Sequence, residues 1–187
     1  MRADLLIYNI GKIYTPIGTK PLCGKDMEKI EEIENAYIAI KDGKILAAGK
    51  SPAAISAERE IDAKGMIALP GFVDSHTHVM HYGSREKEMA LKLKGYSYID
   101  ILKQGGGIHS TVRATREASD EALLQKALKS LEIMLYHGVT TVEVKSGYGL
   151  NTEQEIRLLR LMNQLKSLSV VDIVPTFLGA HAIPQEF

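Results

Sequence analysis

The first third of the chain alternates short apolar runs with polar turns, a pattern typical of β-strands. Residues 4 to about 65 contain several such runs. The stretch 35–49 holds two of them joined by Asp42-Gly43, a pair that tolerates the positive φ angles of a tight hairpin turn. We therefore predict β-sheet here, with the Lys- and Glu-rich residues 25–34 forming a solvated loop.

From about residue 66 onward, strands are predicted to alternate with helices. Apolar or β-branched runs predict three strands, at about 66–74, 139–145 and 170–177. Two amphipathic helices separate the later strands. Strand, helix, strand, helix, strand is the order of a parallel α/β sheet.

The two helices have recognisable starts and apolar faces. Ser119 is a good N-cap for the first helix, which is expected to end at Gly138. The second starts at Asn151 or Thr152, and Thr152 can form a capping box with Glu155. Helical spacing predicts the buried faces to be Leu124, Ala127, Leu128, Leu131, Met134 and Leu135 in the first helix, and Ile156, Leu159, Met162 and Leu165 in the second.

Each predicted parallel strand runs into a stretch with candidate chemistry. The first leads to His76 and His78, the second to residues 145–149, and the third to residues 179–182 around His181. The carboxyl ends of neighbouring parallel strands share one rim, and that rim carries the active site in α/β barrels. We expect these side chains to cluster there.

His76 and His78 are candidate metal ligands. Side chains two apart in a strand point the same way, so both imidazoles can face one ion. Neutral imidazole is a good ligand for zinc or iron. On spacing alone, two unrelated histidines at a strand end are the simpler alternative.

Other candidates on the rim have structural alternatives. His181 can move a proton or hold a polarised carbonyl oxygen, or it can bond to a loop backbone. Tyr148, between two glycines, can donate a hydrogen bond from its phenol, or it can pack. Arg85 can bind a carboxylate bidentately or pair with Glu86 or Glu88. Lys145 is expected to be a salt-bridge partner.

Composition narrows the class of protein. There are 23 basic and 23 acidic residues among 187, so the charge favours neither nucleic acid nor a membrane surface as partner. The first residues lack the pattern of a signal peptide, and no apolar run reaches spanning length. The single Cys23 cannot form an internal disulfide. These features predict a cytoplasmic protein.

The motifs together resemble a known family. Residues 61–78, ending in Asp74-Ser75-His76-Thr77-His78, resemble the opening of the amidohydrolase superfamily. Further motifs are similar to those of the imidazolonepropionase family within it, at residues 83–88, 104–108, 110–112, 143–150 and 177–182. The resemblance covers the whole chain. Family members are about twice as long.

The resemblance implies a fold: a metal-dependent (β/α)8 TIM-barrel hydrolase with a small N-terminal β-sandwich. Residues 1–65 would be part of the sandwich. Residues 66–187 would be a truncated barrel, with about the first three βα units. The remaining metal ligands would lie outside this chain, and the fragment alone is expected to be inactive.

The resemblance also implies an activity, the hydrolysis of 4-imidazolone-5-propanoate to N-formimidoyl-L-glutamate by metal-activated water. It implies one divalent metal, zinc or iron, on His76 and His78, and a homodimer at full length. The implied substrate contacts are Arg85, Tyr98, Tyr148 and His181, with His181 also catalytic. The alternatives are another amidohydrolase, either a cyclic amidase or a deaminase, and a non-catalytic remnant of the fold.

Overall fold

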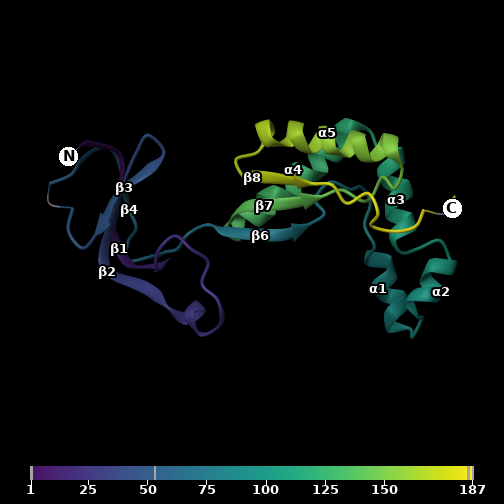
Figure 1. Cartoon of the computed structure of the whole chain (residues 1–187), viewed down its shortest axis with the longest axis horizontal. Coiled ribbons are helices and arrows are strands. Elements are labelled where there is room, and N and C mark those ends of the chain that lie inside the picture. The colour runs from purple at the N-terminus through teal and green to yellow at the C-terminus, as the bar shows by residue number, and fades with distance from the viewer. Residues whose placement is uncertain (1, 53, 185, 187) are drawn as a thin grey trace. The chain divides into compact units, whose positions relative to one another are not determined.

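The computed structural model describes residues 2–52, 54–184 and 186, and the chain divides into two compact units (Figure 1). The first comprises residues Met1–Pro70 and the second Gly71–Phe187. All strands of the first unit form one mixed sheet. The second unit is built on a separate parallel sheet, and it carries every candidate residue for chemistry.

The first unit is a five-stranded sheet whose strand order is β3-β2-β1-β4, with β5 also pairing with β1. The strands are β1 (Arg2–Pro16), β2 (Ile30–Lys41), β3 (Lys44–Gly49), β4 (Ser56–Asp62) and β5 (Ile67–Ala68). The predicted hairpin is confirmed, since β2 and β3 pair antiparallel across Asp42 and Gly43. Both turn residues have positive φ angles, of 52° and 71°.

Two predictions for this unit are corrected. Residues 25–34 are not one loop, because a 3-10 helix (Gly24–Glu28) is followed by β2 from Ile30 onward. Glu32 and Glu34 lie opposite β1, where both carboxylates pair with Lys12 at 2.9 and 3.2 Å. Cross-strand pairs of opposite charge stabilise a sheet, so these acidic residues support a strand.

The predicted strand at 66–74 is two strands. Ile67–Ala68 pairs with β1 in the first unit, and β6 (Phe72–Thr77) starts the second sheet. Pro70 has no N–H for a ladder, which explains the break. Gly71 allows a close approach, because a Cβ there would lie 2.1 Å from Oγ1 of Thr140.

The second unit contains the predicted parallel sheet, in the order β6-β7-β8. Strands β7 (Val139–Lys145) and β8 (Asp172–Thr176) fall where the sequence predicted them. The helices are α1 (Glu86–Leu93), α2 (Tyr98–Lys103), α3 (Ile108–Glu117), α4 (Asp120–Tyr136) and α5 (Thr152–Leu168). Among the described residues, none of these helices has the length and apolarity needed to cross a bilayer.

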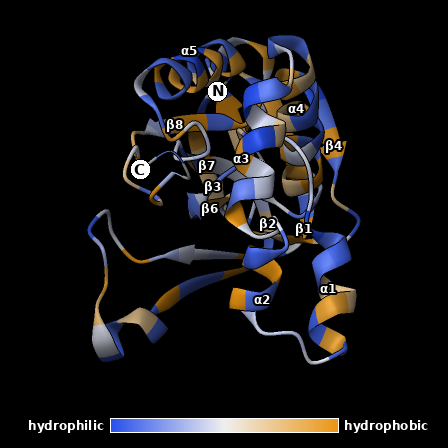
Figure 2. Ribbon diagram, turned by 90° about the vertical axis from the view of Figure 1, so that its right-hand side faces the viewer, coloured by the Kyte–Doolittle hydropathy of each residue, from blue (hydrophilic) through white to orange (hydrophobic). Residues whose placement is uncertain are grey.

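Helices α4 and α5 pack against the sheet, and their hydrophobic and hydrophilic residues are interspersed along each helix (Figure 2). The predicted faces are partly right. Ile156 is 44% exposed, whereas Leu158 and Leu161 are buried. The face of α5 is therefore rotated from the predicted one. Fully buried side chains of this core include Met80, Leu123, Leu131, Val142, Val144, Leu158, Met162 and Leu165.

The helix caps also settle one alternative. Ser119 caps α4 as predicted, with its Oγ accepting from the N–H of Ala122. Asn151 is the N-cap of α5, and its Oδ1 accepts from the N–H of Gln154. The capping box between Thr152 and Glu155 is therefore wrong. The carboxylate of Glu155 turns inward instead.

Apolar residues of the second sheet remain open to solvent. Phe72, Val73 and Val174 are more than half exposed. Parallel sheets are normally covered on both faces. Within the described residues, this sheet therefore presents apolar surface of the kind that further secondary structure covers in complete α/β domains.

Candidate active site

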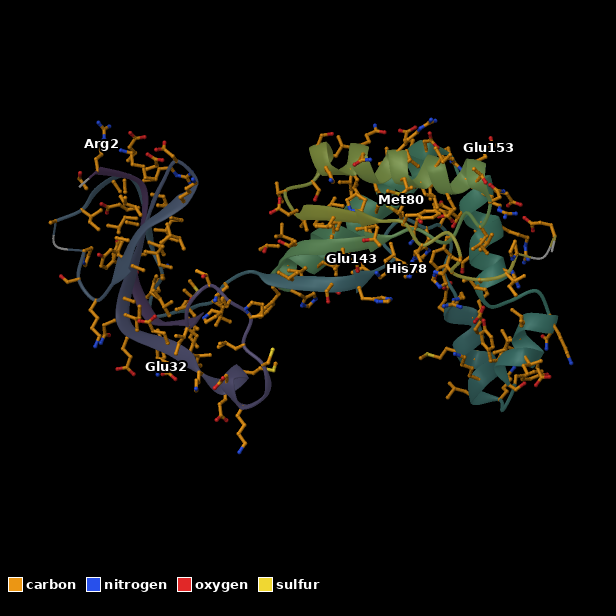
Figure 3. The ribbon with its side chains drawn as sticks, viewed as in Figure 1. Arg2, Glu32, His78, Met80, Glu143 and Glu153 are labelled. Atoms are coloured by element: carbon orange, nitrogen blue, oxygen red, sulfur yellow. The ribbon has the colours of Figure 1, made fainter. Side chains whose placement is uncertain are left out.

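The ends of the three parallel strands bring His78, Tyr148 and His181 together. The ring centroids of His78 and His181 are 4.5 Å apart, and that of Tyr148 is 5.2 Å from His78 and 5.4 Å from His181. His78 lies at the end of the sheet toward which the strands point (Figure 3). The expected clustering at the strand ends is observed for these three side chains.

His76 lies beside His78 at the end of β6. Their ring centroids are 5.9 Å apart, with the rings edge to face. The N–H of His76 donates to Oδ1 of Asp74, and the hydroxyl of Thr77 donates to the carbonyl of Glu143 on β7. These bonds fix the strand end that carries both imidazoles.

The surroundings of His78 favour its neutral form. Burial lowers the pKa of His78 to about 4, and the nearby positive charges of His181 and His76 act in the same direction. Neutral imidazole is the form that binds a metal ion. Burial therefore keeps His78 in the protonation state that a metal ligand would need.

Two buried imidazole nitrogens have no hydrogen-bond partner among the described residues. They are Nδ1 of His78 and Nδ1 of His181. Buried polar atoms without partners are rare and call for an explanation, such as an ion or a ligand. These two imidazole nitrogens are therefore suited to bind a metal ion or a polar substrate between the ends of the strands. No group of three or more His, Cys, Asp or Glu side chains with metal-binding geometry occurs in the described part of the chain.

His81 is a member of this cluster that sequence reasoning assigned no role. Its ring centroid lies 5.1 Å from that of Tyr148, and its Nε2 is 3.2 Å from Nζ of Lys126 on α4. Burial, and then the charge of Lys126, lowers the pKa of His81 to about 4. The only sign of this in the sequence is that His81 lies three residues after His78. That spacing does not show that Tyr148 packs against His81.

Lys145 is a salt-bridge partner, as predicted. Its Nζ lies 2.6 Å from Oε1 of Glu143, two residues earlier on β7, and the hydroxyl of Thr176 donates to the same oxygen at 2.7 Å. The hydrogen bond from Lys145, followed by that from Thr176, lowers the pKa of Glu143. This network ties β7 to β8 near the rim.

Arg85 and Tyr98 lie apart from the ring cluster. Both line a hollow of about 540 Å³ at α1 and α2, together with Glu88 and Met89. Neither makes a ring contact or hydrogen bond with His78, Tyr148 or His181 among the described residues. The charge of Arg85 does reach His81, whose pKa it helps to lower.

The expected alternative for Arg85, a salt bridge with Glu86 or Glu88, is not formed among the described residues. Glu86 accepts from the hydroxyl of Ser84, and Glu88 accepts from the N–H of Gly107 at 2.6 Å. Arg85 is an exposed residue. It is therefore available to an anionic ligand.

Comparisons with known proteins identify what the chain resembles. No protein-family model matches it. Over its whole length it is 97% identical to an imidazolonepropionase of Caldanaerobacter subterraneus subsp. tengcongensis and 79% identical to one of Thermoanaerobacter pseudethanolicus, and it covers 45% of each. It is 51% identical to an imidazolonepropionase of Alkaliphilus metalliredigens, of which it covers 46%.

Solved structures share its fold at lower identity. A mutant atrazine chlorohydrolase from Arthrobacter aurescens, crystallised with zinc and atraton, matches 92% of this chain and 35% of its own, with 23% identity and a TM-score of 0.61. A crystallised amidohydrolase matches 92% of this chain and 31% of its own, with 18% identity and a TM-score of 0.56. These likenesses concern the fold, which is mixed α/β. The expected family resemblance is confirmed, because the whole of this chain aligns with these imidazolonepropionases. The chain spans about 45% of their length.

Proposed function

We propose that this chain is the N-terminal part of an imidazolonepropionase, which hydrolyses 4-imidazolone-5-propanoate to N-formimidoyl-L-glutamate in histidine degradation. The observation that carries the proposal is the convergence of His78, Tyr148 and His181 from three strand ends. It occurs in a chain that is similar to imidazolonepropionases throughout. The full-length enzyme is proposed to be a cytoplasmic homodimer.

The proposal includes a finer description of the fold. The first unit, residues 1–70, is assigned to a composite β-sandwich, and the second, residues 71–187, to the first three βα units of a (β/α)8 barrel. Support comes from the three parallel strands and from the exposed apolar residues Phe72, Val73 and Val174. The strands and ligands that complete such a barrel would lie outside these 187 residues.

His76 and His78 are the proposed metal ligands in this chain. Their adjacent rings and the neutral form of His78 support that role. A divalent ion, zinc or iron, would act as a Lewis acid and activate water for attack on the ring carbonyl. Further ligands are required, because catalytic metal sites usually have at least three protein ligands.

The other residues are proposed to bind and orient the substrate. Arg85 would pair with the propionate carboxylate, since a guanidinium binds carboxylates bidentately, with Tyr98 beside it. Tyr148 would donate a hydrogen bond to the ring. His181 would stabilise the oxygen of the carbonyl under attack and carry a proton. Water adds across the ring amide, the C–N bond breaks, and the nitrogen leaves protonated.

The 187-residue chain by itself is expected to show no turnover and to bind metal weakly, because it offers only two of the proposed ligands. Purified chain and full-length gene product would be compared by metal analysis and by the rate of 4-imidazolone-5-propanoate hydrolysis. Any hydrolysis by the purified 187 residues above the rate without protein would contradict this expectation.

The substrate assignment is tested with the full-length gene product. It is expected to hydrolyse 4-imidazolone-5-propanoate and to leave guanine, cytosine and dihydroorotate unchanged. The last three compounds represent the deaminases and the cyclic amidases. Preference for any of them over the imidazolone would reject the proposed function in favour of another amidohydrolase activity.

Replacing Arg85 with glutamine is expected to raise KM by about 10- to 100-fold and to lower kcat by a smaller factor. The reason is that a charge-assisted hydrogen bond is worth about 1.5–3 kcal/mol. The matched control is Lys87→Gln, which removes the same charge from an exposed position on α1. Steady-state kinetics of the full-length variants would provide the measurement. Equal effects of the two changes would show that general charge, and not a contact of Arg85, is responsible.

A further inference from the structure

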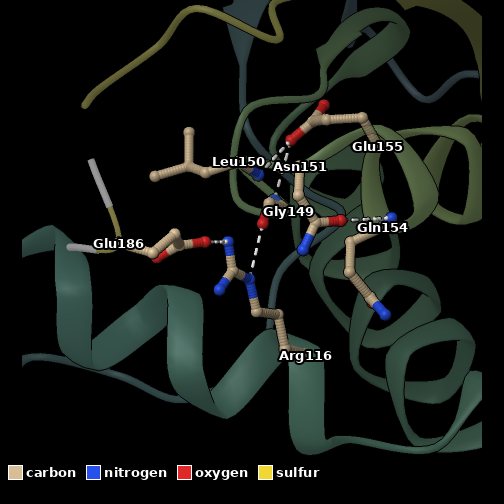
Figure 4. Close-up of polar contacts among 7 residues, drawn as sticks. All are labelled: Arg116, Gly149, Leu150, Asn151, Gln154, Glu155 and Glu186. Carbon is tan, nitrogen blue, oxygen red and sulfur yellow. Dashed lines mark hydrogen bonds and ion pairs between the residues drawn. The ribbon is translucent and has the colours of Figure 1, made fainter. Parts of the chain in front are cut away.

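A buried carboxylate holds the loop that carries Tyr148. Glu155, in the first turn of α5, is 3% exposed. Its Oε1 accepts from the N–H groups of Gly149 and Leu150 at 2.8 and 2.9 Å, and its Oε2 accepts from the N–H of Gly147 at 3.0 Å. Figure 4 shows the contacts of this carboxylate with Gly149 and Leu150. The side chain of Glu155 thus binds the backbone both before and after Tyr148.

The location of Glu155 suits a buried acid. An ionised carboxylate is purely an acceptor, and all three bonds come from backbone donors. The N-terminal turn of a helix also stabilises negative charge. Glu155 therefore has the partners that burial of a charged group requires, without a cationic side chain among them.

The loop is also held by close packing and by a second side chain. A Cβ on Gly149 would lie 2.8 Å from the backbone nitrogen of Glu155, so the loop lies directly on the first turn of α5. The carbonyl of Gly149 accepts from Nε of Arg116 at 2.7 Å (Figure 4). Arg116 fixes this carbonyl, whereas Glu155 binds the three amides.

The same loop is connected to the segment that carries His181. Ser146 is fully buried; its N–H donates to the carbonyl of Thr176, and its Oγ accepts from the N–H of Leu178. A Cβ on Gly147 would lie 2.6 Å from Cβ of His181. The position of this loop therefore determines how Tyr148 and His181 meet His78.

We propose that Glu155 is a positioning residue for the hydrolytic site: by binding the amides of Gly147, Gly149 and Leu150, it holds Tyr148 against His78 and His181. Glu155 acts through the loop and does not touch the substrate. Its effect on turnover rests on the proposed function, whereas its effect on the loop does not. The two parts are tested separately.

Glutamine at position 155 is the informative substitution. Its side chain has nearly the same shape, but one carboxylate oxygen becomes an NH₂ group, which can only donate. Whichever way the amide is oriented, one side of the loop then faces a donor instead of an acceptor. Glu155→Asp keeps both acceptors on a shorter stem and serves as a second variant. Glu153→Gln is the matched control, because Glu153 is an exposed acid in the same helical turn.

In the full-length gene product, Glu155→Gln is expected to lower kcat/KM by about 10- to 100-fold, since small displacements of positioned groups have effects of that size. Glu153→Gln should remain within about 2-fold of the parent. The effect of Glu155→Gln should shrink to less than about 3-fold in a Tyr148→Phe background, because coupled residues are not additive. Equal effects in both backgrounds, at equal folded fractions, would overturn the proposal.

Hydrogen exchange gives a readout that needs no activity. The amides of Gly147, Gly149 and Leu150 should exchange at least about tenfold faster in Glu155→Gln, and by a smaller factor in Glu155→Asp, with the amides of β7 unchanged. Unchanged protection of the loop amides would refute the positioning role. If the parent lacks hydrolase activity while the loop amides still depend on Glu155, the proposed function fails and the loop assignment stands.

Discussion

Replacing His78 with alanine in the full-length protein is expected to remove the bound metal and to reduce hydrolysis to the background rate. Groups that merely support a metal ligand are worth about 10- to 100-fold in metal affinity, so a ligand itself should be worth more than about 100-fold. The buried Nδ1 of His78 has no partner among the described residues, so no competing structural bond is lost. Metal content per protein chain and kcat would be measured on the same preparations.

His137→Ala is the control for this experiment. His137 is an exposed histidine that follows α4, and its ring contacts Tyr136, away from the cluster at the strand ends. The control is expected to keep metal and activity near the parent values. A His78→Ala protein with full metal occupancy would eliminate His78 as a ligand, whatever its activity.

Much of the second unit could be predicted because the local signals agree with one another. The β-branched run 139–145 is a strand, Ser119 caps α4, and the strands are parallel neighbours. Helical faces were harder to predict. Leu158 is buried while Ile156 is exposed, because the orientation of α5 is decided by the sheet beneath it. That information is absent from the helix's own pattern.

The first unit shows where composition misleads. Residues 30–34 are rich in glutamate, which is depleted in strands, yet they belong to β2. Lys12 on β1 provides the partner for Glu32 and Glu34. This pairing joins residues about twenty positions apart, so a window of neighbouring residues cannot reveal it.

For the candidate site, topology was more informative than individual motifs. Parallel strand ends predicted that His78, Tyr148 and His181 would meet, and they do. The inward role of Glu155 was missed, because its spacing from Thr152 matches a capping box. Once Asn151 occupies the cap, that carboxylate is free to reach back to the preceding loop. Whether Asn151 or Thr152 caps α5 is decided by the backbone conformation, which cannot be read from the spacing of the residues.

Gly147→Ala is expected to be strongly destabilising, by about 2–5 kcal/mol, and to inactivate the full-length enzyme. Gly147 has a φ of +112°, a conformation that side-chain-bearing residues rarely adopt, at a cost of about 1–2 kcal/mol. The added Cβ would also lie 2.8 Å from the carbonyl oxygen of Leu178. Overpacking of this kind costs about 1–3 kcal/mol more. Urea denaturation and steady-state kinetics would measure the two effects.

Gly95→Ala separates the backbone effect from the clash. Gly95 also has a positive φ, of +88°, but a Cβ there would meet nothing within 4 Å. This control should lose only the backbone contribution of about 1–2 kcal/mol and keep its kcat. Similar losses in both variants would mean that the segment from Leu178 to His181 moves aside freely. In that case the close packing of Gly147 against His181 would not hold the ring cluster together. The arrangement of Tyr148 with His181 would then depend on the hydrogen bonds of Ser146 and Glu155 alone.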